Sequence, residues 1–322
     1  MKAAIKPRDS SLIPHPLSFS PWPHRLAVVL AWATLPLLFI GGLVTSKGAG
    51  LAVPDWPTTF GYNMFFYPWS QMVGNVFFEH SHRLVASGVG LLTIALAVSF
   101  WLQEGRHWLR WLGLAALALV ILQGIIGGLR VILLENTLAI VHAALAQAFF
   151  ALTVSLAIFT SPDWNRESSD EPIRDGGRLR RLCATTALLI YVQAIVGGVL
   201  RHTGERVDAH LFFAALIALH VAFILVRVMR FHADRPKLTR PAGFLAGLLL
   251  LQLMLGLGSY LGKFTSMLGL ANGTLVILTT THVVTGALML AASLLLTLRA
   301  YRFSITSEAS MNHKVLTEQF SG

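Results

Sequence analysis

The chain has 322 residues, of which 55% are hydrophobic and only 12% are charged. An ordinary soluble domain carries about 25% charged residues, so this composition excludes a soluble protein and indicates one that crosses a membrane several times. The formal net charge of +10 comes from lysines and arginines outside the apolar segments, and it therefore requires no nucleic-acid partner.

Several apolar runs are long enough to cross a bilayer as a helix, which takes about 20 residues. In chain order they cover 26–45, 84–102, 111–129, 138–160, 182–200, 209–226, 242–262 and 274–298. The predicted fold class is an all-α integral membrane protein with eight transmembrane helices, arranged as two pseudo-symmetric four-helix bundles. The corresponding domains are an N-terminal segment (1–25), a first half (26–160), a linker (161–181), a second half (182–300) and a tail (301–322).

Positive charge predicts the orientation of these helices. Most of the 25 lysines and arginines lie in the N-terminal segment, the tail and the three loops that share their side of the membrane. Such an excess marks the cytoplasmic side, so both termini should face the cytoplasm. The first apolar run has no signal-peptide cleavage pattern before it and should be retained. Without a long Arg/Ser-rich leader, the expected location is the bacterial inner (plasma) membrane.

Histidines recur at one position in the even-numbered segments. Each lies near the outer end of its helix and is followed four residues later by alanine or glycine: His82/Ala86, His142/Ala146, His210/Ala214 and His282/Gly286. Residues four apart share a helix face, so the small side chain leaves room for a flat ligand beside the imidazole. Four imidazoles form two pairs, enough to hold the iron of two haems between helices.

The odd-numbered segments carry glycines near their outer ends. Glutamine precedes most of them by four residues, as in Gln123/Gly127-Gly128, Gln193/Gly197-Gly198 and Gln252/Gly256, whereas the first segment has only Gly41-Gly42. The sequence thus repeats as four helical hairpins. Glycines at such positions indicate either close helix packing or close approach of a bulky ligand.

The first histidine has neighbours that the other three lack. Glu79 precedes His82 by one helical turn and Arg83 follows it directly. Glu79 shares the His82 face and could serve as an acid, base or charge stabiliser at a porphyrin edge, or it could be a solvated helix cap. Several outer cations are candidate partners for haem propionates: Lys47, Arg83, Arg130, Arg201, Arg206 and Lys263.

Other features have simpler interpretations. His80 and His220 lie off the repeated face and are expected to pack rather than bind a ligand. The single cysteine, Cys183, excludes an intrachain disulfide and is expected to be a small buried residue. The apolar, aromatic loop 46–78 either caps a cavity above the first half or lies on the membrane surface.

Together, these residues resemble the haem A synthase family. The resemblance rests on Glu79-x-x-His82-Arg83, on His142, His210 and His282, and on the Gly-Gly-Leu-Val-Thr run at 41–45, and it covers about residues 25–300. It implies an oxidoreductase acting on a CH group, which converts a ring methyl of haem O to a formyl group by successive hydroxylations. The product, haem A, serves assembly of terminal haem-copper oxidases.

The resemblance also implies roles for individual residues. His82 and His142 would bind the iron of the substrate haem, with Glu79, His82 and Arg83 as the catalytic residues. His210 and His282 would bind the iron of a haem b cofactor. Some members carry a cysteine pair in the first outer loop, and this chain has none there.

The implied partners are haem O, the haem O synthase (protohaem farnesyltransferase) that makes it, an electron donor that the sequence does not identify, and membrane lipid. A homo-oligomer is left open. Two other functions would also use the four histidines. A transmembrane di-haem b-type electron carrier explains them but not Glu79 and Arg83, and it should hold haems in both leaflets. A haem exporter or chaperone would bind haem weakly.

Overall fold

The computed structural model describes residues 21–165, 176–265, 267 and 269–319. Expectations for residues 1–20, 166–175 and 320–322, and for side chains beyond residue 303, lie outside the described residues. The long helices are α1 (Trp22–Ser46), α2 (Gly74–Gln103), α3 (His107–Leu133), α4 (Asn136–Thr160), α6 (Gly176–Thr203), α7 (Val207–Phe231), α8 (Pro236–Phe264) and α9 (Asn272–Gln319). Among the described residues, eight helices are long and apolar enough to span a membrane, so the chain is a multi-pass membrane protein.

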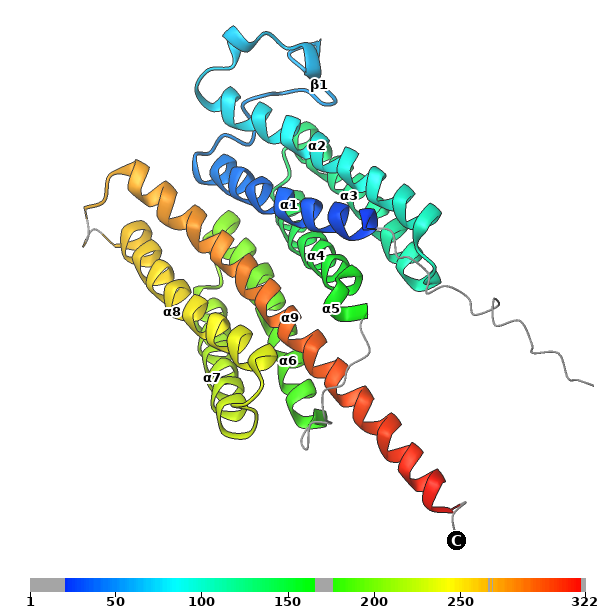
Figure 1. Cartoon of the computed structure of the whole chain (residues 1–322). Helices are drawn as coiled ribbons and strands as arrows, with labels where there is room; N and C mark the ends of the chain where they lie inside the picture. The colour runs from blue at the N-terminus through cyan, green and yellow to red at the C-terminus, as the bar shows by residue number, and fades with distance from the viewer. Residues whose placement is uncertain (1–20, 166–175, 266, 268, 320–322) are drawn as a thin grey trace, which may run out of the picture.

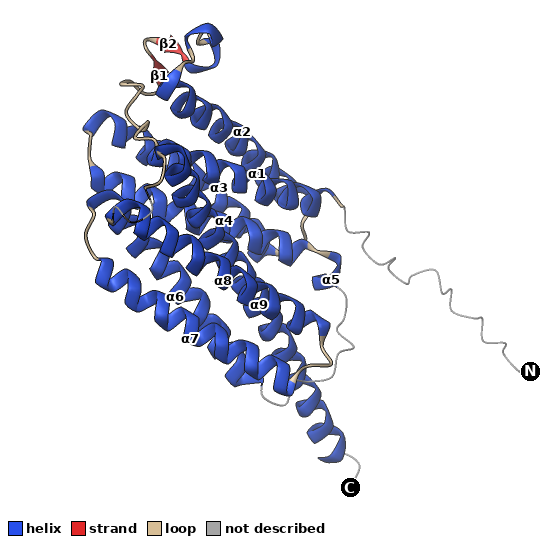
Figure 2. Cartoon of the chain, turned by 90° about the vertical axis from the view of Figure 1, so that its left-hand side faces the viewer, coloured by secondary structure: helices blue, strands red, loops and turns tan. Residues whose placement is uncertain are grey.

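The shorter elements lie outside these spans. Helix α5 (Pro162–Asn165) follows α4, and two 3-10 turns (Met64–Phe66 and Trp69–Gln71) precede α2. Strands β1 (Thr58–Thr59) and β2 (Tyr62–Asn63) pair antiparallel in the loop between α1 and α2. This loop stands at one end of the helix bundle, and the far end of α9 extends from the other (Figure 2).

Helix boundaries differ from the predicted apolar runs mainly at two places. Helix α2 begins at Gly74 rather than at residue 84 because its first turns contain polar side chains that are satisfied within the protein, including Glu79 and His80. Helix α9 continues beyond residue 298 as far as Gln319. The predicted apolar runs therefore locate the helices but understate the length of α2 at the histidine-bearing end and that of α9 at the opposite end.

The helices lie in two neighbouring groups, α1–α4 and α6–α9, and α9 runs along the junction between them (Figure 1). The first group packs around Leu30, Leu96, Phe100, Leu109 and Leu156, among others. The second has its own buried residues, in two clusters: Leu179, Cys183, Ile224, Leu238 and Leu296 in one, and Ile190, Ile217, Leu245 and Met289 in the other. Cys183 is buried, as its sequence context predicted.

Hydrogen bonds join the two groups near the histidines. The guanidinium of Arg201 on α6 donates to the carbonyl of Gly42 on α1 at 2.7 Å and also to the hydroxyl of Ser46. The same Ser46 hydroxyl lies 3.0 Å from the hydroxyls of Thr279 and Thr280 on α9. A polar group within a membrane needs an internal partner, and these residues provide one another with partners across the junction.

Candidate haem-binding sites

The four predicted histidines form two facing pairs, one in each helix group. His82 on α2 faces His142 on α4, with ring centroids 6.5 Å apart. His210 on α7 faces His282 on α9 at 6.3 Å. An imidazole nitrogen lies about 2 Å from a bound transition metal, and the ring centre lies roughly 1 Å farther, so two imidazoles on opposite sides of one metal have centroids about 6 Å apart. Both pairs have this spacing.

Two imidazoles alone do not make a closed metal site. Among the residues that the structure describes, no group of three or more His, Cys, Asp or Glu side chains gathers as a metal site. A haem iron needs only axial ligands from the protein, because the porphyrin supplies the others. The pairs therefore fit a haem better than a bare metal ion.

Each histidine rests against a glycine of the preceding helix. A Cβ added at Gly41 would lie 3.1 Å from Cε1 of His82, and one at Gly127 would lie 3.0 Å from Cε1 of His142. The same contacts join Gly197 to His210 at 3.2 Å and Gly256 to His282 at 3.0 Å. In all four rings Nδ1 is buried and has no hydrogen-bond partner among the described residues. We call these four glycines the histidine seats.

The second glycine of each run has a different neighbour. A Cβ at Gly42 would meet Thr280 of α9 at 3.0 Å, and one at Gly128 would overlap the indole of Trp56. The corresponding contacts are ordinary at Gly198, with Ile140 at 3.9 Å, and at Gly258, with Leu278 at 3.7 Å. The packing interpretation of the glycines is thus confirmed: the first glycine of each run lies against an imidazole, and Gly42 and Gly128 admit another segment of the protein. The close approach of a bulky ligand stays a prediction.

The glutamines before these glycines support the histidine-bearing helices. Nε2 of Gln123 donates to the carbonyl of His142 at 3.0 Å, and Nε2 of Gln193 donates to the carbonyl of His210 at 2.9 Å. Gln252 differs, because its Nε2 lies 3.5 Å from the ring Nε2 of His282. These bonds tie adjacent helices together at the level of the imidazoles.

Glu79 and Arg83 form a buried pair above the first histidine pair. Glu79 is only 4% exposed, which excludes the solvated-cap interpretation. Its Oε1 accepts from Arg83 at 2.8 Å and its Oε2 accepts from the backbone N–H of Val53 at 3.0 Å. Arg83 also donates to the carbonyls of Val53, Asp55 and Thr58. The pair therefore fastens the first loop to α2 one turn from His82.

Asp55 organises the same loop. Its carboxylate accepts from the backbone N–H groups of Phe60 and Gly61 and from the Thr58 hydroxyl. Partial burial alone would raise the pKa of Asp55, but these hydrogen bonds, the one from Gly61 foremost, hold that pKa below its ordinary value. Asp55 is therefore ionised at neutral pH, and its carboxylate is the hydrogen-bond acceptor that stabilises the turn.

His80 and His220 take the packing roles that their positions predicted. His80 is 1% exposed, and its Nδ1 lies 3.1 Å from the Thr59 hydroxyl. Its ring packs against Tyr67 with centroids 5.1 Å apart. Nδ1 of His220 lies 2.9 Å from the Leu216 carbonyl within its own helix.

The loop has a docked part and an exposed part. Trp56 packs on Gly128 of α3, and Gly50 lies against the guanidinium of Arg130. In contrast, Phe66 and Trp69 at the tip are 80% and 78% exposed. The loop consequently caps the first histidine pair through its base, while its tip offers an aromatic surface of the kind that lies at membrane interfaces.

The candidate propionate partners are in different environments. Arg130 lies within electrostatic range of His82, His142 and Glu79, whereas Arg83 and Arg201 are already bonded to protein groups. Lys47, Arg206 and Lys263 are exposed. Arg130 is therefore the cation of this set best placed beside the first pair.

Replacing Gly128 by valine is expected to release the loop from α3. Any Cβ at this position overlaps Trp56, and overpacking of this kind costs about 1–3 kcal/mol. Chymotrypsin should then cut loop 47–73 faster, by about tenfold or more. Gly124→Val on the same helix is the control, because a Cβ there meets nothing within 4 Å. Equal cleavage rates in the two variants would contradict the docking.

Sequence reasoning singled out the glycines of the histidine seats but did not show that they contact the histidines. The repeated Gln-x-x-x-Gly spacing was the available signal, but the distance along the chain from each seat to its histidine varies between hairpins. Only the folded hairpins show that each of the four glycines meets an imidazole.

Comparison with known proteins agrees with this geometry. Residues 24–212, more than half of the chain, match the COX15-CtaA family model, described as cytochrome oxidase assembly protein. The match includes His82, His142 and His210, and it ends before His282.

Curated relatives give the same result at modest identity. The Heme A synthase of Shouchella clausii is 30% identical over 183 residues, covering 56% of this chain and 59% of the relative. The Heme A synthase of Alkalihalophilus pseudofirmus is 30% identical over 149 residues, or 45% and 48% of the two chains. That of Geobacillus kaustophilus is 26% identical over 178 residues, or 53% and 54%. The chain spans about half the length of the curated relatives it matches, and by its family match it belongs to the COX15-CtaA family of cytochrome oxidase assembly proteins.

Proposed function

We propose that the chain is a haem A synthase, an oxidoreductase that acts on a CH group of haem O. It would convert one ring methyl to a formyl group by successive hydroxylations, for assembly of terminal haem-copper oxidases. The relatives named Heme A synthase and the cytochrome oxidase assembly family support this activity. So does the presence of two histidine pairs with the spacing of axial haem ligands.

The observation that carries the proposal is the difference between the two pairs. Among the described residues, only the pair of His82 and His142 has beside it a buried carboxylate bonded to a guanidinium and a docked loop. The positions that correspond to Glu79 in the other histidine helices are Ala139, Val207 and Thr279. An electron carrier with two equivalent haems has no need for this asymmetry, whereas an enzyme with one substrate site and one cofactor site does.

The difference leads to an assignment of the two halves. In the first half (26–160), His82 and His142 would bind the iron of the substrate, haem O. In the second half (182–300), His210 and His282 would hold a haem b cofactor. When bound there, haem b supplies a centre that accepts and passes on single electrons.

Glu79 is placed to handle protons at the substrate site. Conversion of a methyl to a formyl group is a four-electron oxidation that replaces two C–H bonds by one C=O bond, so protons must leave the reacting carbon and its oxygen. Each carboxylate oxygen of Glu79 accepts one hydrogen bond from the protein and retains a further lone pair. We assign Glu79 as the proton acceptor at the porphyrin edge, with Arg83 holding it in place.

We further propose the location and partners of the protein. The lysine and arginine distribution supports a plasma-membrane protein with both termini in the cytoplasm and the histidine pairs near the outer surface. The haem O synthase would supply the substrate, and a separate electron donor or acceptor would serve the haem b site.

Haem extraction followed by mass analysis tests the activity, using membranes that make haem O. We expect formylated haem A with the wild type. We expect haem O or a hydroxylated intermediate with Glu79→Ala, because the proton acceptor is lost, at a rate reduced by about 100-fold or more. Glu79→Gln keeps an acceptor for Val53 and should fail equally if the carboxylate charge is required.

Glu135→Ala is the matched control, since this exposed acid stands at the same end of the bundle at the start of α4. It should give wild-type yields of haem A. Recovery of haem b alone from wild type, in equal amounts at two sites, would identify an electron carrier and refute the synthase.

A further inference from the structure

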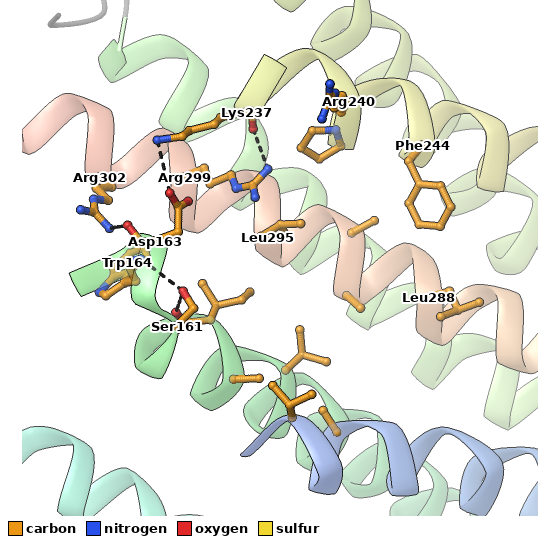
Figure 3. Close-up of a pocket in the computed structure, with 18 of the residues that line it drawn as sticks. Ser161, Asp163, Trp164, Lys237, Arg240, Phe244, Leu288, Leu295, Arg299 and Arg302 are labelled. Carbon is orange, nitrogen blue, oxygen red and sulfur yellow. Dashed lines mark hydrogen bonds and ion pairs between the residues drawn. The ribbon is translucent and has the colours of Figure 1, made fainter. Parts of the chain in front are cut away.

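A cavity lies at the end of the bundle opposite the histidines, between the two helix groups (Figure 3). Its volume is about 650 Å³, and its walls come from α1, α4, α5, α8 and α9. Along α9 it extends from Leu288 to Phe303, about 22 Å of helix at the usual rise. This length exceeds the roughly 15 Å of hydrocarbon in one leaflet, so the cavity can reach from the headgroups along an acyl chain.

The deep part of the cavity is apolar. Trp32 of α1, Phe244 of α8 and Leu288 and Leu295 of α9 contribute most of its large side chains, with Ala291 between the two leucines. Trp32 is 69% exposed and Phe244 is 58% exposed. Such side chains face hydrocarbon in a membrane, so the cavity can take a chain from the surrounding lipid without a polar barrier.

The mouth is strongly basic. Four cations line it, Lys237, Arg240, Arg299 and Arg302, together with one acid, Asp163. Asp163 lies 3.4 Å from Nζ of Lys237 and its carbonyl accepts from Arg302, while Arg299 donates to the Lys237 carbonyl. One carboxylate cannot balance four cations, so the lining side chains carry a net positive charge.

Arg240 differs from the other three cations. It is exposed, and among the described residues it makes no hydrogen bond or ion pair, whereas Lys237, Arg299 and Arg302 all do. A guanidinium offers five N–H donors in a geometry that matches phosphate oxygens. Arg240 therefore supplies the donors that a phosphate at this mouth would need.

Trp164 indicates the depth at which the mouth of the cavity lies in the membrane. The guanidinium carbon of Arg302 lies 5.3 Å from the ring centroid of Trp164, and Figure 3 shows both side chains beside Asp163. Tryptophan concentrates where hydrocarbon meets the headgroups. The basic mouth is thus at headgroup depth and the apolar wall continues into the hydrocarbon.

We propose that this cavity binds an anionic phospholipid from the leaflet at this end of the protein. The phosphate is held by Arg240 with Arg299 and Lys237, and one acyl chain lies along Trp32, Phe244 and Leu288. Basic pockets between membrane helices recognise anionic headgroups in this way. Because α1 and α4 come from the first half, α5 from the linker, and α8 and α9 from the second half, the lipid joins the two halves.

Native mass spectrometry of the full-length protein tests the site, with equal amounts of phosphatidylglycerol and phosphatidylcholine added. We expect the wild type to retain phosphatidylglycerol preferentially. Arg240→Glu should lower this retention by about 30-fold, because it changes the charge at the phosphate by two units. Ala291→Phe should lower it too, by filling the space for the acyl chain. The melting temperature of each variant establishes that it is folded.

Arg230→Glu is the matched control, an exposed cation near the end of α7 that does not line the cavity. It should change retention by about threefold or less, as expected for a screened surface charge. An equal loss in Arg230→Glu and Arg240→Glu, or equal retention of the two lipids by wild type, would overturn the proposal. Displacement of the lipid by inorganic phosphate, with no effect of Ala291→Phe, would identify an anion site instead and overturn it as well.

Discussion

If each histidine pair binds one haem, as proposed, substitution of His282 by alanine is expected to remove one of the two haems and leave the other. His282 and His210 form one pair in the second helix group, and the pair in the first group shares no ligand with it. Loss of one axial imidazole leaves the iron of that haem with a single protein ligand. The ratio of haem to protein, measured by pyridine haemochrome spectra, should fall by about half.

His220→Ala provides the control for this experiment. His220 lies on α7 with His210, but its Nδ1 lies against the Leu216 carbonyl of its own helix. The haem content of this variant should equal that of the wild type. If His282→Ala retained both haems, or if His220→Ala lost one, the assignment of the second pair would be wrong.

Replacement of Gly256 by valine should reproduce the His282→Ala phenotype without changing any haem ligand. The new Cβ would lie 3.0 Å from Cε1 of His282, and the branched side chain would push the imidazole off its seat. Loss of an orienting contact commonly weakens metal affinity by about 10- to 100-fold. Haem retention during gel filtration in detergent would measure this loss.

Gly247→Val on the same helix separates this effect from general damage to α8. A Cβ at Gly247 meets nothing within 4 Å, so this variant should keep its haem and its melting temperature. A Gly256→Val protein with full haem content would show that the seat does not fix the position of the imidazole.

The sequence was sufficient to predict the helices and the histidine pairs because both depend on local patterns. Apolar runs of membrane-spanning length identify helices, and a histidine recurring at one helical position predicts one ligand from each even-numbered span. The start of α2 was misplaced because Glu79 and His80 interrupt its apolar run, although both are buried. Hydropathy alone cannot reveal that a polar side chain finds its partner in a distant loop.

Contacts between distant segments account for what the sequence did not reveal. Trp56 and Gly128 are far apart in the chain. Nothing in the sequence around either residue indicates that the indole of Trp56 packs against Gly128. Likewise, the sequence presented Arg83 as a partner for a propionate, whereas its guanidinium bonds Glu79 and three loop carbonyls. Such pairings arise from tertiary packing, which leaves no periodic signal.

The histidine seats link the position of each imidazole to the spacing between two helices. At Gly41, Gly127, Gly197 and Gly256 the ring touches the neighbouring backbone with no side chain between them. Sliding or separating the helices of one hairpin would move the imidazole with its helix, because no flexible group could absorb the displacement. Bilayer thickness acts on helix tilt, so a change in the thickness of the membrane would alter the positions of the four imidazoles relative to one another.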